Sequence, residues 1–261
     1  MPSFNENALI HVSEFADKYN EKILSDWREK SSDYKHKWME ALRFFFDHVF
    51  YQGRRNDLSK VFLDRSWGVL EDNLSDNSSA SEARYESLWQ DGTIPDNPSW
   101  HKREVSNRLL DELKQAEVSK RGDRELVVDT LRFLRNLPRL NIVNRSISKI
   151  KGGCIAKHYQ ELQKIRYVGP KTAAFYLRDL CFVYSLKVEE DDLAVQPVDR
   201  WVKKIACRIK ISLPEDGEDA VAGKIVEACK HVGVSPLCFN AGAWYMGTHA
   251  LDILFEPFEG G

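Results

Sequence analysis

A short turn containing glycine and proline joins two helical patterns near the middle of the chain, over residues 156–164 and 171–186. The turn reads Ile165-Arg166-Tyr167-Val168-Gly169-Pro170. Proline has a fixed φ and no N–H, so Pro170 suits the last turn position or the first helical position, and Lys171 then opens the second helix. This predicts a tight helical hairpin. Lys171 would lie at a helix N-terminus, where unpaired N–H groups attract phosphate and disfavour an ammonium charge.

A second motif follows the hairpin, where Gln196-Pro197 leads into Val198-Asp199 directly before a helical pattern over residues 200–210. The Asp199 carboxylate can cap that helix by accepting a hydrogen bond from the N–H of Trp201 or Val202. Capping alone would explain an aspartate here. It is also compatible with a chemical role, because a capped carboxylate is held rigidly and kept ionised.

Together the two motifs resemble the catalytic hairpin of the helix-hairpin-helix DNA glycosylase superfamily. In that family leucine-proline-glycine-valine-glycine-x-lysine-threonine-alanine is followed by a Val-Asp pair. The matching residues are Val168, Gly169, Lys171, Thr172, Ala173, Val198 and Asp199. The chain departs from the pattern with Ile165, Arg166 and Tyr167 in place of the leucine, the proline and the first glycine.

The resemblance implies that Lys171 and Asp199 are the catalytic residues. It also implies that the hairpin contacts the DNA backbone through Arg166, Val168, Gly169 and Thr172. A lysine that contacts phosphate in a non-catalytic hairpin is the alternative for Lys171. The Val198-Asp199 pair favours catalysis, since a hairpin that only binds DNA does not need it.

The last helical pattern, from Ser235-Pro236 to Gly247, is similar to the archaeal 8-oxoguanine glycosylase branch of the superfamily. In that branch the tryptophan matching Trp244 stacks on the flipped base, and the acidic residue matching Asn240 bonds to it. Gln52 resembles in position the residue that fills the gap left by the flipped base. The alternatives are a core aromatic for Trp244 and a surface glutamine in a turn for Gln52.

The chemistry expected of this family begins with a neutral Lys171 amine. The amine attacks C1′ of the deoxyribose and displaces the base, which leaves a Schiff base that can eliminate the 3′ phosphate. An ordinary lysine titrates near about 10.4, so burial and the helix N-terminus must lower its pKa. Asp199 would stabilise positive charge developing on the sugar and help proton transfer.

We therefore expect a bifunctional DNA glycosylase with AP (apurinic or apyrimidinic site) lyase activity, which excises an oxidised base, above all 8-oxoguanine, in base excision repair. The expected partner is double-stranded DNA that contains a damaged base, bound by a monomer. One alternative is a non-catalytic DNA-binding or repair-scaffold protein with the same fold. The other is a glycosylase for oxidised pyrimidines.

The charge of the chain is unevenly distributed. The net charge is −2, yet residues 132–178 contain eleven Lys or Arg residues and one acid, Glu161. That segment carries +10, so the remainder carries −12. Such a run is often only a solvated face, but beside a helical hairpin it indicates a surface that faces phosphates.

The cysteines and histidines suggest no cofactor. The five cysteines are scattered, and the region of the family's four-cysteine iron–sulfur loop contains only Cys229 and Cys238. This spacing predicts no disulfide framework, no zinc site and no cluster, and the seven dispersed histidines suggest no catalytic metal. No apolar run is long enough to span a bilayer and residues 1–14 do not resemble a signal peptide, so we expect a cytoplasmic protein.

The chain of 261 residues should form an all-α protein of two lobes. Helical patterns cover residues 6–29, 36–50, 101–118, 123–136, 218–232 and 236–247, besides the hairpin and residues 200–210. Residues 72–100 are polar and rich in helix breakers, which predicts a long excursion. The resemblance implies one lobe over residues 38–186 that ends in the hairpin and a second over residues 1–37 and 187–261. The active site would lie in the cleft between the lobes.

Overall fold

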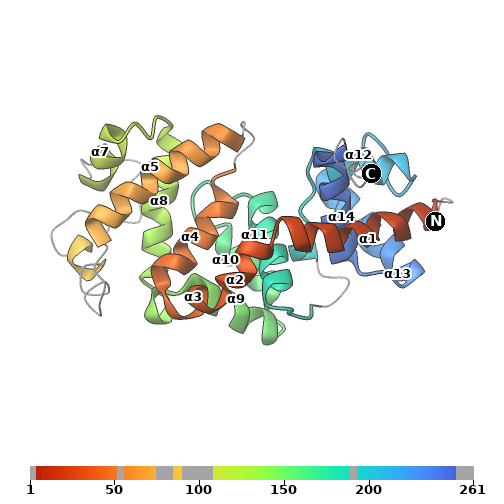
Figure 1. Cartoon of the computed structure of the whole chain (residues 1–261), viewed down its shortest axis with the longest axis horizontal. Coiled ribbons are helices and arrows are strands. Elements are labelled where there is room, and N and C mark those ends of the chain that lie inside the picture. The colour runs from red at the N-terminus through yellow and green to blue at the C-terminus, as the bar shows by residue number, and fades with distance from the viewer. Residues whose placement is uncertain (1–3, 52–55, 75–84, 90–107, 189–192, 251–261) are drawn as a thin grey trace, which may run out of the picture. The chain divides into compact units, whose positions relative to one another are not determined.

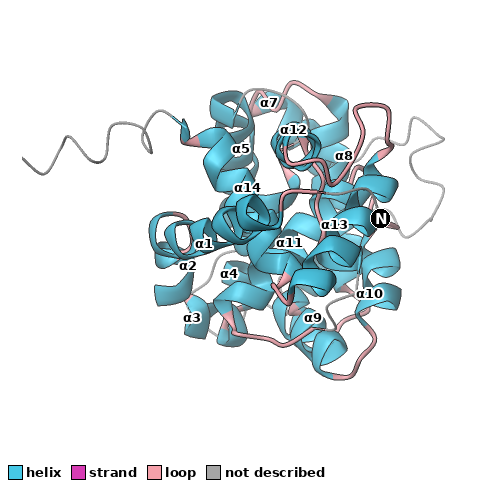
Figure 2. Ribbon diagram, turned by 90° about the vertical axis from the view of Figure 1, so that its right-hand side faces the viewer, coloured by secondary structure: helices cyan, strands magenta, loops and turns pink. Residues whose placement is uncertain are grey.

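The computed structural model of the protein describes residues 4–51, 56–74, 85–89, 108–188 and 193–250 (Figure 1). Within these ranges the regular elements are helices, which confirms the predicted all-α class for the described part of the chain (Figure 2). The α-helices are α1 (Glu6–Lys22), α2 (Ser25–Glu29), α3 (Ser31–His36), α4 (Trp38–Val49), α5 (Asn56–Leu74), α7 (Arg108–Gln115), α8 (Arg121–Leu134), α9 (Ile142–Lys151), α10 (Ile155–Leu162), α11 (Pro170–Val183), α12 (Arg200–Arg208), α13 (Glu218–Val232) and α14 (Pro236–Thr248). Two 3-10 turns are η2 (Pro138–Leu140) and η3 (Leu193–Val195). None of the described helices combines the length and apolarity that a membrane span requires.

The chain divides into two compact units. Unit 1 comprises residues 1–32, 146–159 and 173–261, and unit 2 comprises residues 33–145 and 160–172. This division differs from the lobes expected from the sequence, because residues 146–159 and 173–186 group with unit 1 and residues 33–37 group with unit 2. The physical reason is that the boundaries between the units fall inside α9, α10 and α11, each of which contributes residues to both units. The boundaries expected from the sequence lie between helices.

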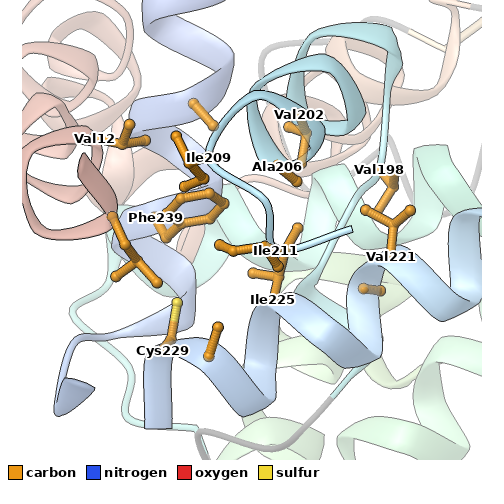
Figure 3. Close-up of a cluster of buried hydrophobic side chains, with 14 residues drawn as sticks. Val12, Val198, Val202, Ala206, Ile209, Ile211, Val221, Ile225, Cys229 and Phe239 are labelled. Carbon is orange, nitrogen blue, oxygen red and sulfur yellow. The ribbon is translucent and has the colours of Figure 1, made fainter. Parts of the chain in front are cut away.

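Unit 1 is built around the pair α1 and α14, which lie side by side (Figure 1). Asn5 begins α1 by accepting a hydrogen bond from the N–H of Ala8. The buried residues of α1 then recur with the helical period: Leu9, Val12, Ala16 and Tyr19. Leu9 and Val12 share a core with residues of α12, α13 and α14, which Figure 3 shows around Phe239 and Ile211. Ala16 and Tyr19 belong to a second cluster with Ala241 and Tyr245 of α14.

The approach of α1 to α14 requires a glycine. A Cβ atom at Gly242 of α14 would lie 1.9 Å from the backbone oxygen of Val12 and 3.3 Å from the backbone nitrogen of Ala16. Backbone atoms cannot move aside as the end of a side chain can. The absence of a side chain at position 242 therefore sets how closely the two helices pack.

In unit 2, helices α4 and α8 are each largely buried. The three consecutive residues Phe44, Phe45 and Phe46 are fully buried, so α4 is covered on more than one face. His48 in the same helix is buried as well, and its Nδ1 lies 2.7 Å from the carbonyl oxygen of Phe44. The predicted buried helix over residues 36–50 is thus confirmed, with bounds at Trp38–Val49.

Some local expectations need correction. The helix expected over residues 6–29 is interrupted between α1 and α2, where the side chain of Leu24 is fully buried. Helices α5 and α9 were not expected, because α5 precedes a polar stretch and α9 lies in the basic segment between Pro138 and Gly152. Of the excursion expected over residues 72–100, residues 75–84 and 90–100 lie outside the described ranges, while 72–74 end α5 and 85–89 are helical.

The glycine contact predicts a large effect of a single methyl group. Gly242→Ala should lower the free energy of unfolding by about 3 kcal/mol or more, because the new Cβ forces α1 away from α14. Gly223→Ala in α13 is the matched control, since no atom lies within 4 Å of its added Cβ, and it should stabilise by up to about 1 kcal/mol. Urea unfolding of both variants measures the difference; equal stabilities would contradict the packing described here.

Candidate active-site residues

The hairpin forms as the sequence predicts. Helix α10 ends at Leu162 and α11 begins at Pro170, which occupies the first helical position. Between them the N–H of Ile165 donates to the carbonyl of Leu162 at 3.0 Å, and the N–H of Val168 donates to that of Ile165 at 3.0 Å. These two turn bonds close the loop and place Lys171 in the first turn of α11.

Tyr167 occupies the turn position at which the resemblance leads one to expect glycine. Its φ is +65°, in the left-handed region that costs a residue with a Cβ about 1 kcal/mol or more. The ring lies against α8, where a Cβ atom at Gly122 would come within 2.9 Å of Cε1 of Tyr167. Packing on Gly122 therefore offsets part of the backbone strain.

Arg166 fastens the turn to α8. Its guanidinium donates from Nε and Nη2 to Glu125 Oε2 at 3.1 and 2.9 Å, and its backbone N–H donates to Asp129 Oδ2 at 2.8 Å. Glu125 is only 2% exposed. Burial alone would raise its pKa, but hydrogen bonds and charge from Arg121 and Arg166 hold the pKa below its ordinary value.

The residues expected to contact the DNA backbone are thus engaged within the protein. Besides Arg166, the N–H of Val168 belongs to the turn. The N–H of Gly169 donates to Thr172 Oγ1 at 3.1 Å, and that hydroxyl lies at the same distance from the carbonyl of Gly169, to which it can donate. The first helical N–H groups have no intrahelical acceptor. At this helix start the amides of Lys171 and Thr172 are therefore the groups suited to a phosphate.

Lys171 is half-buried in the first turn of α11. No hydrogen bond or ion pair joins its ammonium to any residue in the described ranges. Several other cations of unit 2 do have carboxylate partners: Arg43 pairs with Asp64, and Arg145 pairs with Glu161. Lys171 is therefore available to a ligand.

Asp199 caps α12, as predicted. Its Oδ1 accepts hydrogen bonds from the N–H groups of Trp201 and Val202 at 2.8 and 2.9 Å. No contact joins its second oxygen, Oδ2, to a donor in the part of the chain that the structure describes. The carboxylate is consequently fixed through one oxygen and open at the other.

A buried network lies beside Asp199 in unit 1. Arg178 of α11 is fully buried and donates to Asp179 Oδ1 at 2.8 Å, to Asn240 Oδ1 at 2.9 Å and to the hydroxyl of Tyr19. Burial alone would lower the pKa of Arg178, but Asp179, Tyr19 and Asp199 together hold it above its ordinary value. For Tyr19 burial acts in the opposite direction and raises the pKa, so its hydroxyl stays protonated and donates to Asp179.

Asn240 and Trp244 belong to α14. Asn240 is fully buried, accepts from Arg178 and donates from Nδ2 to the carbonyl of Pro197 at 2.9 Å, so both ends of its amide are used within the protein. Trp244 is partly buried, packs against the unit 1 core and meets the Tyr19 ring edge-on at 5.5 Å between centroids. The structure thus gives Asn240 a hydrogen-bonding role and Trp244 a packing role within unit 1, and their base-pocket roles stay predictions.

Two glutamines bear on the site, Gln52 from the candidate residues and Gln196 near Asp199 in the sequence. Gln52 lies outside the described residues. Gln196, which the sequence did not single out as a site residue, is 5% exposed, and its buried Oε1 has no hydrogen-bond partner among the described residues. It stands three residues before Asp199, so the segment that carries the candidate carboxylate contains an unsatisfied buried acceptor.

The basic segment 132–178 needs one correction. Its charges do not all face outward: Arg178 is fully buried, while Arg132, Arg145 and Arg166 have carboxylates within ion-pair distance. The physical reason is that acids distant in sequence, such as Glu125, fold against these cations. A sequence window cannot reveal them.

Metal ligation finds no support in the geometry. Among the described residues, no group of three or more His, Cys, Asp or Glu side chains could hold a metal ion.

Comparisons with known proteins give a short match. A stretch of 79 residues is 33% identical to the uncharacterized protein MJECL21 of Methanocaldococcus jannaschii, which covers 28% of this chain and 18% of that protein. The chain therefore spans less than a fifth of this relative, whose name assigns no activity. No protein-family model and no solved structure match the chain.

The anchoring of the hairpin through Glu125 predicts a pH-dependent loss of stability. At pH 7, Glu125→Gln should lower the free energy of unfolding by about 1–3 kcal/mol, because charged hydrogen bonds to Arg121 and Arg166 are lost. The pKa of Glu125 in the folded protein lies below its unfolded value of about 4.3. The stabilisation from the charged carboxylate is therefore complete above about pH 4.3 and disappears as the pH falls through the folded pKa. Denaturant unfolding at pH 7 and pH 3 should show the difference between variant and wild type shrinking in acid.

Glu117→Gln is the control, since its ion pair with Arg65 is exposed to solvent and should contribute under about 1 kcal/mol. A Glu125→Gln variant as stable as this control at pH 7 would show that the hairpin does not depend on Glu125.

Proposed function

We propose that the protein is a DNA glycosylase with AP lyase activity that acts through a Schiff base on Lys171. The observation that carries the proposal is Lys171 itself, a half-buried lysine in the first turn of α11 with no carboxylate partner in the described ranges. A nucleophilic amine must shed its proton, and a neighbouring carboxylate would oppose that loss. The position combines a helix N-terminus with the absence of such a carboxylate.

The proposed reaction uses a flipped nucleotide, because C1′ is inaccessible to a side chain inside a duplex. The Lys171 amine forms a bond to C1′ as the bond from C1′ to the base breaks, and the base leaves with the bonding electron pair. Proton loss from the nitrogen and opening of the sugar ring then give the Schiff base. β-Elimination of the 3′ phosphate and hydrolysis of the imine release the protein.

Asp199 is proposed to stabilise the positive charge that develops on the sugar. Its Oδ1 is held by two backbone N–H groups, so the orientation of the carboxylate is settled before substrate binds. Its Oδ2 is the oxygen left to face the sugar. A preorganised carboxylate is worth more than a mobile one, because no reorganisation is needed during the reaction.

The loop that carries Asp199 is held in place within unit 1. Arg178 bonds to Asn240, which in turn bonds to the carbonyl of Pro197, two residues before Asp199. The Asp199 carboxylate is thus oriented by contacts within unit 1, which supports its proposed role.

The expected substrate is duplex DNA with an oxidised base, with 8-oxoguanine first and oxidised pyrimidines second. A non-catalytic DNA-binding or scaffold protein is the competing function. The N–H groups of Val168 and Gly169 donate within the turn. This bears on how the hairpin binds phosphate and does not distinguish an enzyme from a scaffold.

Borohydride trapping separates the enzyme from the scaffold. The protein should form a covalent complex with a duplex containing 8-oxoguanine, because borohydride reduces the Schiff base to a stable amine. Lys171→Gln should abolish trapping, whereas Lys164→Gln, an exposed lysine between the two hairpin helices, should not affect it. Thymine glycol and abasic duplexes run in parallel identify the substrate class.

Trapping on the abasic duplex alone would reduce the proposal to a lyase. Trapping that survives Lys171→Gln would assign the Schiff base to another amine, and no trapping on any duplex would favour the scaffold.

Asp199→Asn tests the carboxylate without removing the cap, since asparagine caps helices as well as aspartate does. The variant should unfold at the wild-type denaturant midpoint but excise the base about 100-fold more slowly or worse in single turnover. An unchanged rate would remove Asp199 from the mechanism.

A further inference from the structure

Helix α12 carries a stripe of cations that the sequence analysis did not assign to DNA. Residues 200–210 contain five basic side chains and no acid: Arg200, Lys203, Lys204, Arg208 and Lys210. Arg200, Lys204 and Arg208 recur every four residues, so they share one side of the helix and are exposed. We refer to these three residues as the α12 stripe.

The charges of the stripe are not balanced within its own helix. Other helices place an acid four residues from a cation, as in Arg108–Glu112 of α7 and Arg121–Glu125 of α8. In α12 both four-residue steps join like charges, which destabilises an isolated helix by about 0.2–0.5 kcal/mol each. A helix face that only meets solvent does not need like charges at this spacing. A bound anionic ligand would turn their repulsion into a net attraction.

No carboxylate from elsewhere in the described ranges neutralises the stripe. Its three side chains make no ion pair with a described residue. The acids Asp199 and Asp216 touch α12. Asp199 caps it by accepting from the N–H groups of Trp201 and Val202. The carbonyl of Asp216 accepts from Lys203 Nζ, and its carboxylate accepts from Leu213 N–H and Lys224 Nζ. Asp216 thus has its own partners, and the stripe keeps its full charge.

An aromatic ring braces the stripe. The guanidinium of Arg200 lies 4.9 Å from the centre of the Trp201 ring, and Lys204 Nζ lies 5.4 Å from it. Trp201 in turn packs against Gly247 of α14, where an added Cβ would lie 2.5 Å from the Cβ of Trp201. Two of the three cations are therefore held by a ring that cannot easily move, which reduces the entropy lost when they bind.

We propose that the α12 stripe is a second phosphate-binding surface for duplex DNA, in unit 1 and separate from the hairpin. The three charges follow one another at about 6 Å along the helix axis. DNA offers one phosphate per about 3.4 Å on each strand, so consecutive cations can each find a phosphate. The choice of DNA as the ligand rests on the proposed function; the presence of an anion-binding surface rests on the stripe alone.

The test is the salt dependence of binding to an undamaged, fluorescently labelled duplex, which requires no chemistry at Lys171. Each phosphate contact contributes about 0.9 to the slope of log K against log salt. The triple variant Arg200→Gln, Lys204→Gln, Arg208→Gln should therefore bind more weakly and show a slope smaller by about 2.7. Between 50 and 200 mM salt it should lose about 40-fold less affinity than the wild type.

Two controls separate charge at this position from charge in general. Lys30→Gln, Lys187→Gln, Lys230→Gln removes three exposed cations from the same unit and should leave the slope unchanged. Arg200→Lys, Arg208→Lys keeps the charge of the stripe and should keep the slope. Circular dichroism of the purified variants verifies that they remain folded.

A stripe variant with the wild-type slope would overturn the inference. So would a stripe variant that still binds DNA normally but no longer binds vesicles containing an anionic phospholipid, because the surface would then serve a membrane. Failure of trapping at Lys171 with a reduced slope in the stripe variant would instead leave this surface standing and remove the proposed catalysis.

Discussion

The buried ion pair between Arg178 and Asp179 is the interaction on which unit 1 depends. Taking a guanidinium out of water costs several kcal/mol unless its donors find partners. Here the partners come from three elements, since Asp179 lies in α11, Tyr19 in α1 and Asn240 in α14. A helix displaced from its register would leave a buried charge or hydrogen bond unsatisfied. The pair therefore specifies the arrangement of helices more than it adds to net stability.

The same network determines where the candidate carboxylate lies. Asn240 connects Arg178 to the carbonyl of Pro197, and Asp199 follows Pro197 by two residues before it caps α12. The close packing of α14 on α1 at Gly242 fixes Asn240 in turn. Asparagine suits this position because its amide both accepts and donates, whereas an aspartate would place a second carboxylate oxygen against the Pro197 carbonyl. Its role in this structure is to support the loop that holds Asp199.

Patterns local in sequence were the ones that predicted the structure. The hairpin with Pro170 at the start of α11, the Asp199 cap and the bounds of α13 follow from turn chemistry, capping and hydrophobic period, which act within a few residues. Helix α5 was missed because it runs into a polar stretch, and α9 because it lies in a short basic segment between Pro138 and Gly152.

Properties that depend on distant partners could not be predicted in the same way. Arg178 appeared as one more DNA-facing cation, and only the tertiary fold shows that Tyr19 and Asn240 surround it. The Arg166 side chain donates to Glu125, which lies 41 residues away in the sequence. The α12 stripe is the opposite case. Its lack of acids is visible in the sequence, but averaging charge over a long window concealed it.

The central claim is that Lys171 and Asp199 serve one sugar. A crystal structure of the Lys171→Gln protein bound to a duplex with a tetrahydrofuran abasic-site analogue tests it most directly. The account predicts the ring of that sugar within about 4 Å of both the side chain at position 171 and Asp199 Oδ2. A sugar bound at only one of these positions, or at neither, would contradict it.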